Sequence, residues 1–140
     1  MNIFVTGATG VLGRPVVQSL VAAGCSVRAL SRSEHNATTI RRLGAEPVSA
    51  DLFDPAALKQ ILTRSDAVLH LATRIPPTAK MAKRASWLEN DHLRRDGTRN
   101  LVEAALAASS IQNGEVILLT VLAGLDTPVA CGSAGKCPTK

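Results

Sequence analysis

The chain has 140 residues, of which 46% are apolar, and this is typical of one globular domain with its own core rather than of a disordered protein. The net charge of +5 comes from scattered bases, and the sequence holds one Trp, two Phe and no Tyr. It therefore lacks the stacking surfaces of single-strand nucleic-acid binders, and we interpret its one basic cluster, Arg94, Arg95 and Arg99, as a solvated helix face.

Three further features bear on location and on metal binding. No apolar run approaches the roughly 20 residues that cross a bilayer, and the first expected strand leaves no room for a signal peptide before it. Cys25, Cys131 and Cys137 are an odd count without paired spacing. We therefore expect a cytoplasmic protein that has no membrane span and no metal site.

The first elements surround a glycine-rich segment. Asn2–Thr6 is predicted to be a strand, Val11–Ala23 has apolar residues at helical spacing, and Gly24 provides a helix stop. Between them, residues 5–14 read Val-Thr-Gly-Ala-Thr-Gly-Val-Leu-Gly-Arg. A glycine-rich turn that joins a strand to a helix is typical of a dinucleotide-binding site.

Each glycine of this turn has a separate predicted purpose. Gly7 lets the chain turn sharply after the strand, Gly10 lets a phosphate approach the backbone, and Gly13 lets the helix pack closely on the sheet. The first amides of the helix lack partners within the helix and lie at its positive dipole end. The residues predicted to contact a dinucleotide here are Gly7, Thr9, Gly10, Val11, Leu12 and Gly13.

The remaining chain alternates between helical and strand patterns. The expected elements are a strand at Ser26–Leu30, a helix at Ala37–Leu43 closed by Gly44, a strand at Pro47–Ala50, a helix capped by Asp54 and running to Thr63, a strand at Ala67–Leu71, a loop with Pro76 and Pro77, a helix at Ala85–Ala108 and a strand at Val116–Leu122. Such alternation predicts an α/β fold with a doubly wound parallel sheet of Rossmann type, in the order 3-2-1-4-5. We expect one domain over residues 1–125 and a flexible tail over residues 126–140.

The residues at the end of the second strand bear on the choice between NAD and NADP. A carboxylate there repels the 2′-phosphate of NADP, whereas a hydroxyl and a guanidinium bind it. Ser31 and Arg32 therefore favour NADP, with NAD as the alternative. Glu34 lies near the usual offset of the acid that binds NAD, but beyond the expected end of the strand. The alternative interpretation of Arg32, as an ordinary surface charge that binds no cofactor, also stays open.

With these residues placed, the chain resembles the extended or atypical short-chain dehydrogenases, which include NAD-dependent epimerases, dehydratases and reductases. The similarity covers residues 1–108 and rests on four motifs in order: Thr6 to Gly13, Asp51-Leu52, His70-Leu71-Ala72, and Gly97-Thr98-Arg99-Asn100-Leu101. The resemblance implies that Asp51 and Leu52 contact the adenine, and that Leu71, Ala72 and Thr73 lie beside the cofactor at its ribose and nicotinamide.

Several of these residues also have a local interpretation. Asp51 accepts from an adenine amine or stabilises the loop before Asp54. His70 is a hydrogen-bonded core residue rather than a catalyst. Thr98 bonds back to a helix carbonyl, and Asn100 bridges neighbouring backbone.

The chain departs from the family at the residues of catalysis. The resemblance implies a Tyr that exchanges a proton with substrate and a Lys four residues after it, but the sequence contains no Tyr, so we assign no catalytic residue. Arg94 stands where relatives place Asn, and the likeness ends near Ser110, which we interpret as truncation before a substrate-binding half. We expect the NAD(P)-binding portion of such an enzyme, which is not catalytically competent alone, while the full-length proteins of the family act on an unidentified small molecule. The alternatives are a redox sensor without catalysis, or an interaction module that pairs with another subunit through its open sheet edge.

Overall fold

The computed structural model describes residues 1–112 and 117–120. Within these residues a parallel five-stranded sheet has the order β3-β2-β1-β4-β5, which confirms the predicted doubly wound topology. The strands are β1 (Asn2–Thr6), β2 (Ser26–Ser31), β3 (Glu46–Ser49), β4 (Ala67–His70) and β5 (Ile117–Thr120). The expected tail at residues 126–140, and part of the strand expected at Val116–Leu122, lie outside the described residues.

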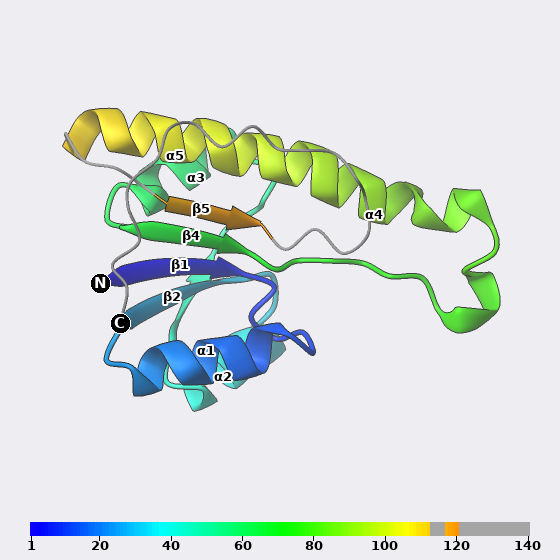
Figure 1. The fold of residues 1–140 in the computed structure, drawn as a ribbon, viewed down its shortest axis with the longest axis horizontal. Coiled ribbons are helices and arrows are strands. Elements are labelled where there is room, and N and C mark those ends of the chain that lie inside the picture. Colours follow the sequence, from blue (N-terminus) through cyan, green and yellow to red (C-terminus); the bar gives the residue numbers. More distant parts are fainter. Residues whose placement is uncertain (113–116, 121–140) are drawn as a thin grey trace, which may run out of the picture.

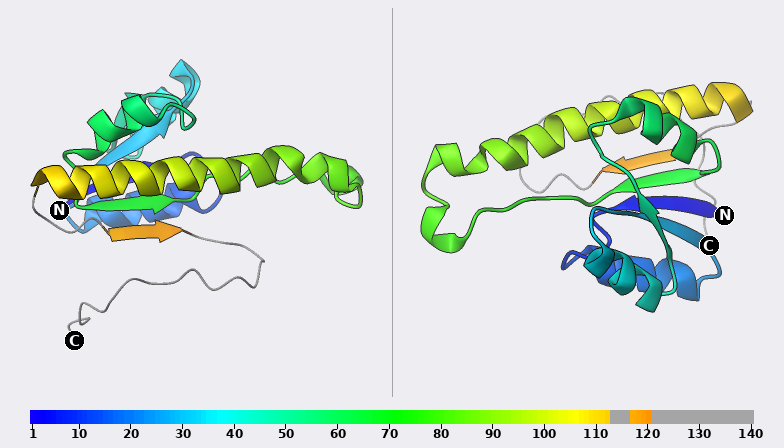
Figure 2. Two further views of the ribbon diagram at one scale, coloured as in Figure 1. Left: turned by 90° about the horizontal axis from the view of Figure 1, so that it is seen from above. Right: turned by 180° about the vertical axis from the view of Figure 1, so that it is seen from behind.

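The helices cover both faces of this sheet (Figure 1). Helices α1 (Gly13–Ala22) and α2 (Glu34–Arg42) lie on one face, and α3 (Pro55–Leu62) and α5 (Thr98–Gln112) lie on the other. The helix α4 (Leu88–His92) and the chain that follows β4 extend beyond the carboxyl edge of the sheet (Figure 2). This extension contains two 3₁₀ turns, Thr78–Lys80 and Arg84–Trp87.

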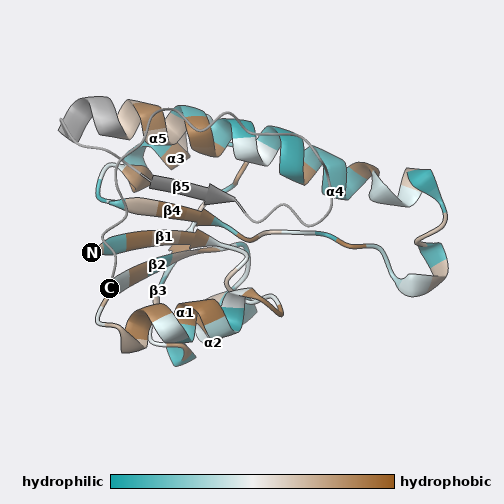
Figure 3. Cartoon of the chain, viewed as in Figure 1, coloured by the Kyte–Doolittle hydropathy of each residue, from teal (hydrophilic) through white to brown (hydrophobic). Residues whose placement is uncertain are grey.

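Alternation along β1 divides the interior into two cores. Ile3 and Val5 belong to the core under α1 and α2, whereas Phe4 belongs to the core under α3 and α5. Figure 3 shows the corresponding hydrophobic colour along β1 and α1, while α4 is largely hydrophilic. Since both faces of the sheet are covered, β1 and β4 contain unbroken apolar runs at residues 3–5 and 67–69.

Capping residues explain where two helices begin. Asp54 accepts from the backbone amides of Ala56 and Ala57, which confirms the predicted start of α3. Helix α2 begins at Glu34, three residues before the expected start, because the Ser33 side chain accepts from the amide of Asn36. Strand β2 continues to Ser31, one residue further than expected.

The expected single helix over Ala85–Ala108 was wrong. A π-helical turn, Leu93–Gly97, separates α4 from α5, and a 3₁₀ turn precedes α4. The apolar face predicted for this helix is nevertheless buried, since Leu93, Leu101 and Ala105 are at most 7% exposed. A π turn changes the angular offset between the helices on either side of it, and such turns are frequent at functional sites.

Two negative findings concern the described residues alone. None of their helices combines the length and the apolar composition that a bilayer crossing requires. Nor do they bring together three or more His, Cys, Asp or Glu side chains in an arrangement suited to a metal ion.

Candidate functional site

The predicted site residues come together at the carboxyl edge of the sheet, where β1 and β4 lie side by side (Figure 1). Strand β1 has β2 on one side and β4 on the other, so the sheet grows in opposite directions from β1 as the chain proceeds. Ligands of open α/β sheets bind at this topological switch point. The turn over residues 7–13, called the glycine turn below, lies here and joins β1 to α1 as predicted.

The glycines of this turn meet very different surroundings. Gly7 has a φ of +78°, and a Cβ there would lie 2.6 Å from the backbone nitrogen of Ala72. A Cβ on Gly13 would lie 2.0 Å from the carbonyl oxygen of Gly7 and 2.7 Å from two Ala8 backbone atoms, so the crowding arises within the turn and not, as expected, against the sheet. At Gly10 the same construction meets one atom, the Gly7 oxygen at 3.3 Å. Protein packing therefore demands Gly7 and Gly13, and leaves the space beside Gly10 open.

The start of α1 is suited to an anion. Its N-cap residue, Leu12, offers no side-chain acceptor, and its first turn contains no acidic residue. Val11 and Leu12 are 92% and 55% exposed beside it. Arg14 donates from Nε to the carbonyl oxygen of Thr9 at 2.9 Å, so a cation braces the turn. Sequence reasoning missed Arg14, although a base directly after the third glycine was a visible signal.

A pocket of about 170 Å³ lies at the end of β2 and is called the β2-end pocket below. Its lining residues are Ser31, Arg32, Ser33, Glu34, Ala37, Arg41, Pro47 and Ser49. Ser31 is buried, and its hydroxyl donates to the Ser33 carbonyl oxygen at 2.8 Å. The pocket thus contains both predicted residues, Ser31 and Arg32, together with Arg41, which sequence reasoning missed. Arg41 lies two helical turns after Glu34, a spacing that places both on one face of α2.

Asp51 and Leu52 lie in the loop between β3 and α3. The Asp51 carboxylate accepts from the Phe53 amide at 3.0 Å, so its predicted loop-stabilising role is confirmed and its contact with adenine stays a prediction. Leu52 is 3% exposed and packs in the second core, against Gly97. The Leu52 side chain is therefore structural. Its predicted contact with the cofactor stays a prediction, which only the Leu52 backbone could make.

His70 is buried at the end of β4, as expected for a core histidine. Its Nδ1 shares a hydrogen bond of 2.5 Å with Thr6 Oγ1, but Nε2 has no hydrogen-bond partner in the described structure. Burial, and secondarily the nearby Arg94 charge, lower the pKa of His70 to about 4. The ring is therefore neutral at neutral pH, and the expectation of a fully hydrogen-bonded histidine was half correct.

The segment after β4 runs beside α4 and is fastened to it. Asn90 is 3% exposed, and its Oδ1 accepts from the Arg74 amide at 2.9 Å. Arg74 also pairs with Glu89 at 2.8 Å. On the other side of the π turn, Asn100 donates to the Leu52 carbonyl oxygen at 3.1 Å, which confirms its predicted bridging role. Two asparagines thus hold the two loops that border the predicted cofactor site.

Asn90→Ala is expected to lower the free energy of unfolding by about 1–2 kcal/mol, because the Arg74 amide loses its acceptor in a partly buried place. Urea denaturation measures this change. Asn36→Ala is the control, since the Asn36 side chain makes no hydrogen bond within the described residues; we expect a change of about 0.5 kcal/mol or less. Equal losses in both variants would contradict an anchoring role for Asn90.

Other residues near the π turn modify two expectations. Thr98 does not bond back to a carbonyl, because its buried Oγ1 has no partner in the described structure. Of the basic cluster, Arg95 and Arg99 are exposed and pair with Asp96, at 3.1 and 3.9 Å. Arg94 is only partly exposed and lies close enough to His70 to lower its pKa. The interpretation as a solvated face therefore holds for two of the three arginines.

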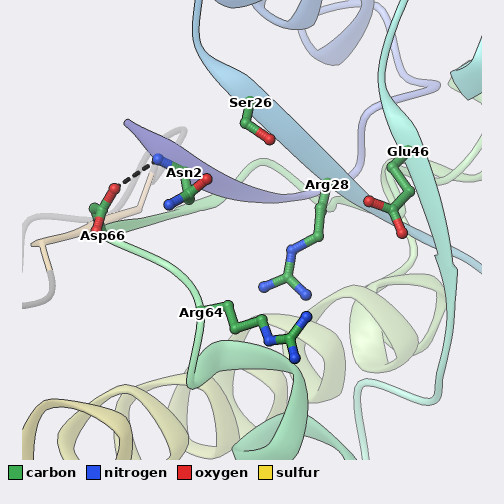
Figure 4. A pocket seen from close by; sticks show the side chains of 6 residues that line it. All are labelled: Asn2, Ser26, Arg28, Glu46, Arg64 and Asp66. Atoms are coloured by element: carbon green, nitrogen blue, oxygen red, sulfur yellow. Dashed lines mark hydrogen bonds between the residues drawn. The ribbon is translucent and has the colours of Figure 1, made fainter. Parts of the chain in front are cut away.

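Another pocket, of about 410 Å³, lies at the opposite edge of the sheet (Figure 4). Its lining residues come from the strand starts and the adjoining loop: Asn2, Ser26, Arg28, Glu46, Arg64 and Asp66. Arg28 donates to the Ile61 carbonyl oxygen and to Ser65 Oγ, and Asp66 accepts from the Asn2 amide. These bonds link β1 and β2 to the end of α3. Because ligands of parallel sheets bind at the carboxyl edge, this amino-edge pocket is not the nucleotide site.

Comparisons with known proteins agree with this geometry. A family model described as the NAD dependent epimerase/dehydratase family matches residues 3–120. A 4-hydroxy-2-methyl-3-oxo-4-farnesyl-3,4-dihydroquinoline-1-oxide ketoreductase of Stigmatella aurantiaca is 38% identical over 105 residues, which is 75% of this chain and 30% of the relative. A ceramide reductase of Caulobacter vibrioides is 32% identical over 133 residues, which is 94% of this chain and 38% of the relative.

A solved structure gives the same result. The short-chain dehydrogenase/reductase family oxidoreductase of Burkholderia thailandensis aligns with a TM-score of 0.67 and 29% identity, over 84% of this chain and 50% of that chain. The chain therefore spans about a third of the two curated relatives and half of the solved one. It belongs to the NAD-dependent epimerase/dehydratase family of extended short-chain dehydrogenases, and corresponds to part of the longer proteins of that family.

Proposed function

We propose that these residues bind a nicotinamide dinucleotide at the carboxyl edge of the sheet, with the pyrophosphate against the glycine turn. The observation that carries the proposal is the contrast between Gly13 and Gly10. The turn is packed to its limit at Gly13, yet open at Gly10, beside an α1 start that no side chain caps. A phosphate that lies there accepts from backbone amides at the positive end of the helix dipole.

We further propose that the preferred cofactor is NADP. The adenosine ribose of a dinucleotide held at the glycine turn reaches the end of β2, where the β2-end pocket lies. Arg32 supplies a guanidinium there, and guanidinium groups bind phosphates through paired, charge-assisted hydrogen bonds. Ser31 and Ser49 add hydroxyl groups to the same lining. Glu34 is the feature that favours NAD instead.

Arg32→Ala is expected to weaken NADPH binding about tenfold and to leave NADH binding within about twofold, because NADPH alone carries the 2′-phosphate. Fluorescence or calorimetric titration of the purified chain measures both affinities. Arg64→Ala removes an exposed arginine at the amino edge and serves as the charge-matched control. Equal losses for both cofactors contradict the NADP assignment, and the lack of saturable binding by either cofactor contradicts the dinucleotide site itself.

For catalysis we propose that these 140 residues hold the cofactor and supply no tyrosine as general acid, since the sequence contains none. His70 does not replace it, because its ring is buried and bonded to Thr6. The same observation favours a second candidate, a redox sensor that distinguishes oxidised from reduced cofactor without turnover. A sensor binds the two redox forms with different affinities, and the titration above, repeated with NADP⁺, tests for that difference.

A further inference from the structure

We propose that Arg41 is a second determinant of cofactor choice, and that its ion pair with Glu34 sets how strongly the pocket prefers a 2′-phosphate. This inference rests on the proposed dinucleotide site. Glu34 is the first residue of α2, and Arg41 Nη1 lies 2.7 Å from Glu34 Oε1. Both residues line the β2-end pocket together with Arg32. The pair therefore brings a guanidinium and a carboxylate to the place where a 2′-phosphate or a 2′-hydroxyl would lie.

Exposure makes this ion pair easy to exchange. The Arg41 and Glu34 side chains are 56% and 79% exposed, so solvent screens the pair and its net contribution to stability is small. A phosphate monoester carries nearly two negative charges at neutral pH, whereas Glu34 carries one. A 2′-phosphate in the pocket therefore attracts Arg41 more strongly than Glu34 does, and Arg41 is the partner that changes.

Glu34 acts in the opposite direction for the two ligands. Beside a 2′-phosphate its carboxylate is a like charge in the same pocket, which lowers the affinity. Beside an unphosphorylated ribose it is an acceptor for the 2′-hydroxyl and keeps the Arg41 charge neutralised. The pocket consequently has two usable charge arrangements, and the preference for NADP is moderate in the native chain. Removing the carboxylate should strengthen that preference, and removing Arg41 should weaken it.

The probes for this test are adenosine 2′,5′-bisphosphate and adenosine 5′-monophosphate, which differ by the 2′-phosphate alone. Isothermal calorimetry gives both affinities for the wild-type chain. We expect Glu34→Gln to tighten bisphosphate binding about threefold and Arg41→Ala to weaken it about fivefold, with monophosphate binding within about twofold in Arg41→Ala. Arg42→Ala is the matched control, because Arg42 is the exposed neighbour of Arg41 on α2 and does not line the pocket.

The outcomes separate this inference from the proposal on which it rests. If wild type prefers the bisphosphate and Arg32→Ala removes that preference, while Arg41→Ala and Glu34→Gln behave like Arg42→Ala, the role of the ion pair is overturned and the NADP site stands. If neither nucleotide binds wild type, the dinucleotide site itself is overturned. Circular dichroism confirms that each variant is folded, which we expect because all four substituted positions are exposed.

Discussion

Gly13→Ala is expected to lower the free energy of unfolding by about 3 kcal/mol or more. Gly10→Ala is expected to lower it by about 1 kcal/mol or less, and to weaken nucleotide binding instead. A methyl group on Gly13 would stand 2.0 Å from the Gly7 carbonyl oxygen and 2.7 Å from two Ala8 backbone atoms. These backbone atoms can move away from the methyl group only if the whole glycine turn changes its conformation. Urea denaturation of both variants measures the difference in stability.

The second half of this expectation concerns the ligand. A methyl group on Gly10 meets one protein atom at 3.3 Å, which a shift of a few tenths of an ångström relieves. The same methyl group occupies the open space in which we propose that the pyrophosphate lies. We expect Gly10→Ala to weaken NADPH and NADH alike by about tenfold or more, since both carry the pyrophosphate. This common loss distinguishes it from Arg32→Ala, which affects NADPH alone.

Gly24→Ala is the control for backbone strain without crowding. Gly24 has a φ of +79°, and a Cβ there meets nothing within 4 Å. We therefore expect a loss of about 1 kcal/mol, from the left-handed backbone alone. If Gly13→Ala is no less stable than Gly24→Ala, the turn is not packed as described. If Gly10→Ala binds both cofactors normally, the pyrophosphate does not lie against this turn.

The sequence predicts those parts of the site that depend on backbone geometry. Three glycines between a strand and a helix pattern define the turn, because few other residues adopt the φ of Gly7 or fit at Gly13. The strand order follows from the alternation of elements, since parallel strands need crossovers of one hand. Asp54 and Asn100 were also interpreted correctly, because each interaction is local or belongs to a recognised motif.

The parts that sequence reasoning missed depend on contacts between distant segments. The π turn at Leu93–Gly97 does not follow from an apolar period that is compatible with an uninterrupted helix. Asn90 acts on Arg74, 16 residues away, and no short motif encodes that bond. The expected helix at Ala37–Leu43 contained Arg41 but left Glu34 outside it, so the two residues were not placed on one helix face and their ion pair beside the β2-end pocket was missed. Boundaries are the least certain part of a sequence-based prediction.

Acidification is expected to destabilise the wild-type chain through His70. The folded protein holds the pKa of His70 at about 4, and the unfolded chain has the ordinary value of 6.5. Between these values the unfolded state binds a proton that the folded state does not, so the free energy of unfolding falls as the pH falls. The full effect is about 3 kcal/mol, present above pH 6.5 and lost by pH 4, with about 2 kcal/mol of it lost by pH 5.

His70→Asn is the test, because asparagine keeps a polar group near Thr6 and does not titrate. Denaturation in urea at pH 7 and at pH 5 gives the change in stability for each protein, and subtracting the variant from the wild type cancels the contributions of other groups. The comparison stops at pH 5 because carboxylates titrate below it. We expect the wild type to lose about 2 kcal/mol more than the variant over this interval.

His35→Asn is the matched control, since it removes an exposed histidine of α2 by the same substitution. His70→Asn also tests whether the His70 ring takes up a proton in the folded protein between pH 7 and pH 5. If the wild type and His70→Asn lose the same stability between pH 7 and pH 5, the folded state takes up a proton on His70 as readily as the unfolded state does, and the neutral buried ring is contradicted. A loss that is about 2 kcal/mol larger in the wild type than in the variant instead shows that burial keeps the ring neutral in the folded protein.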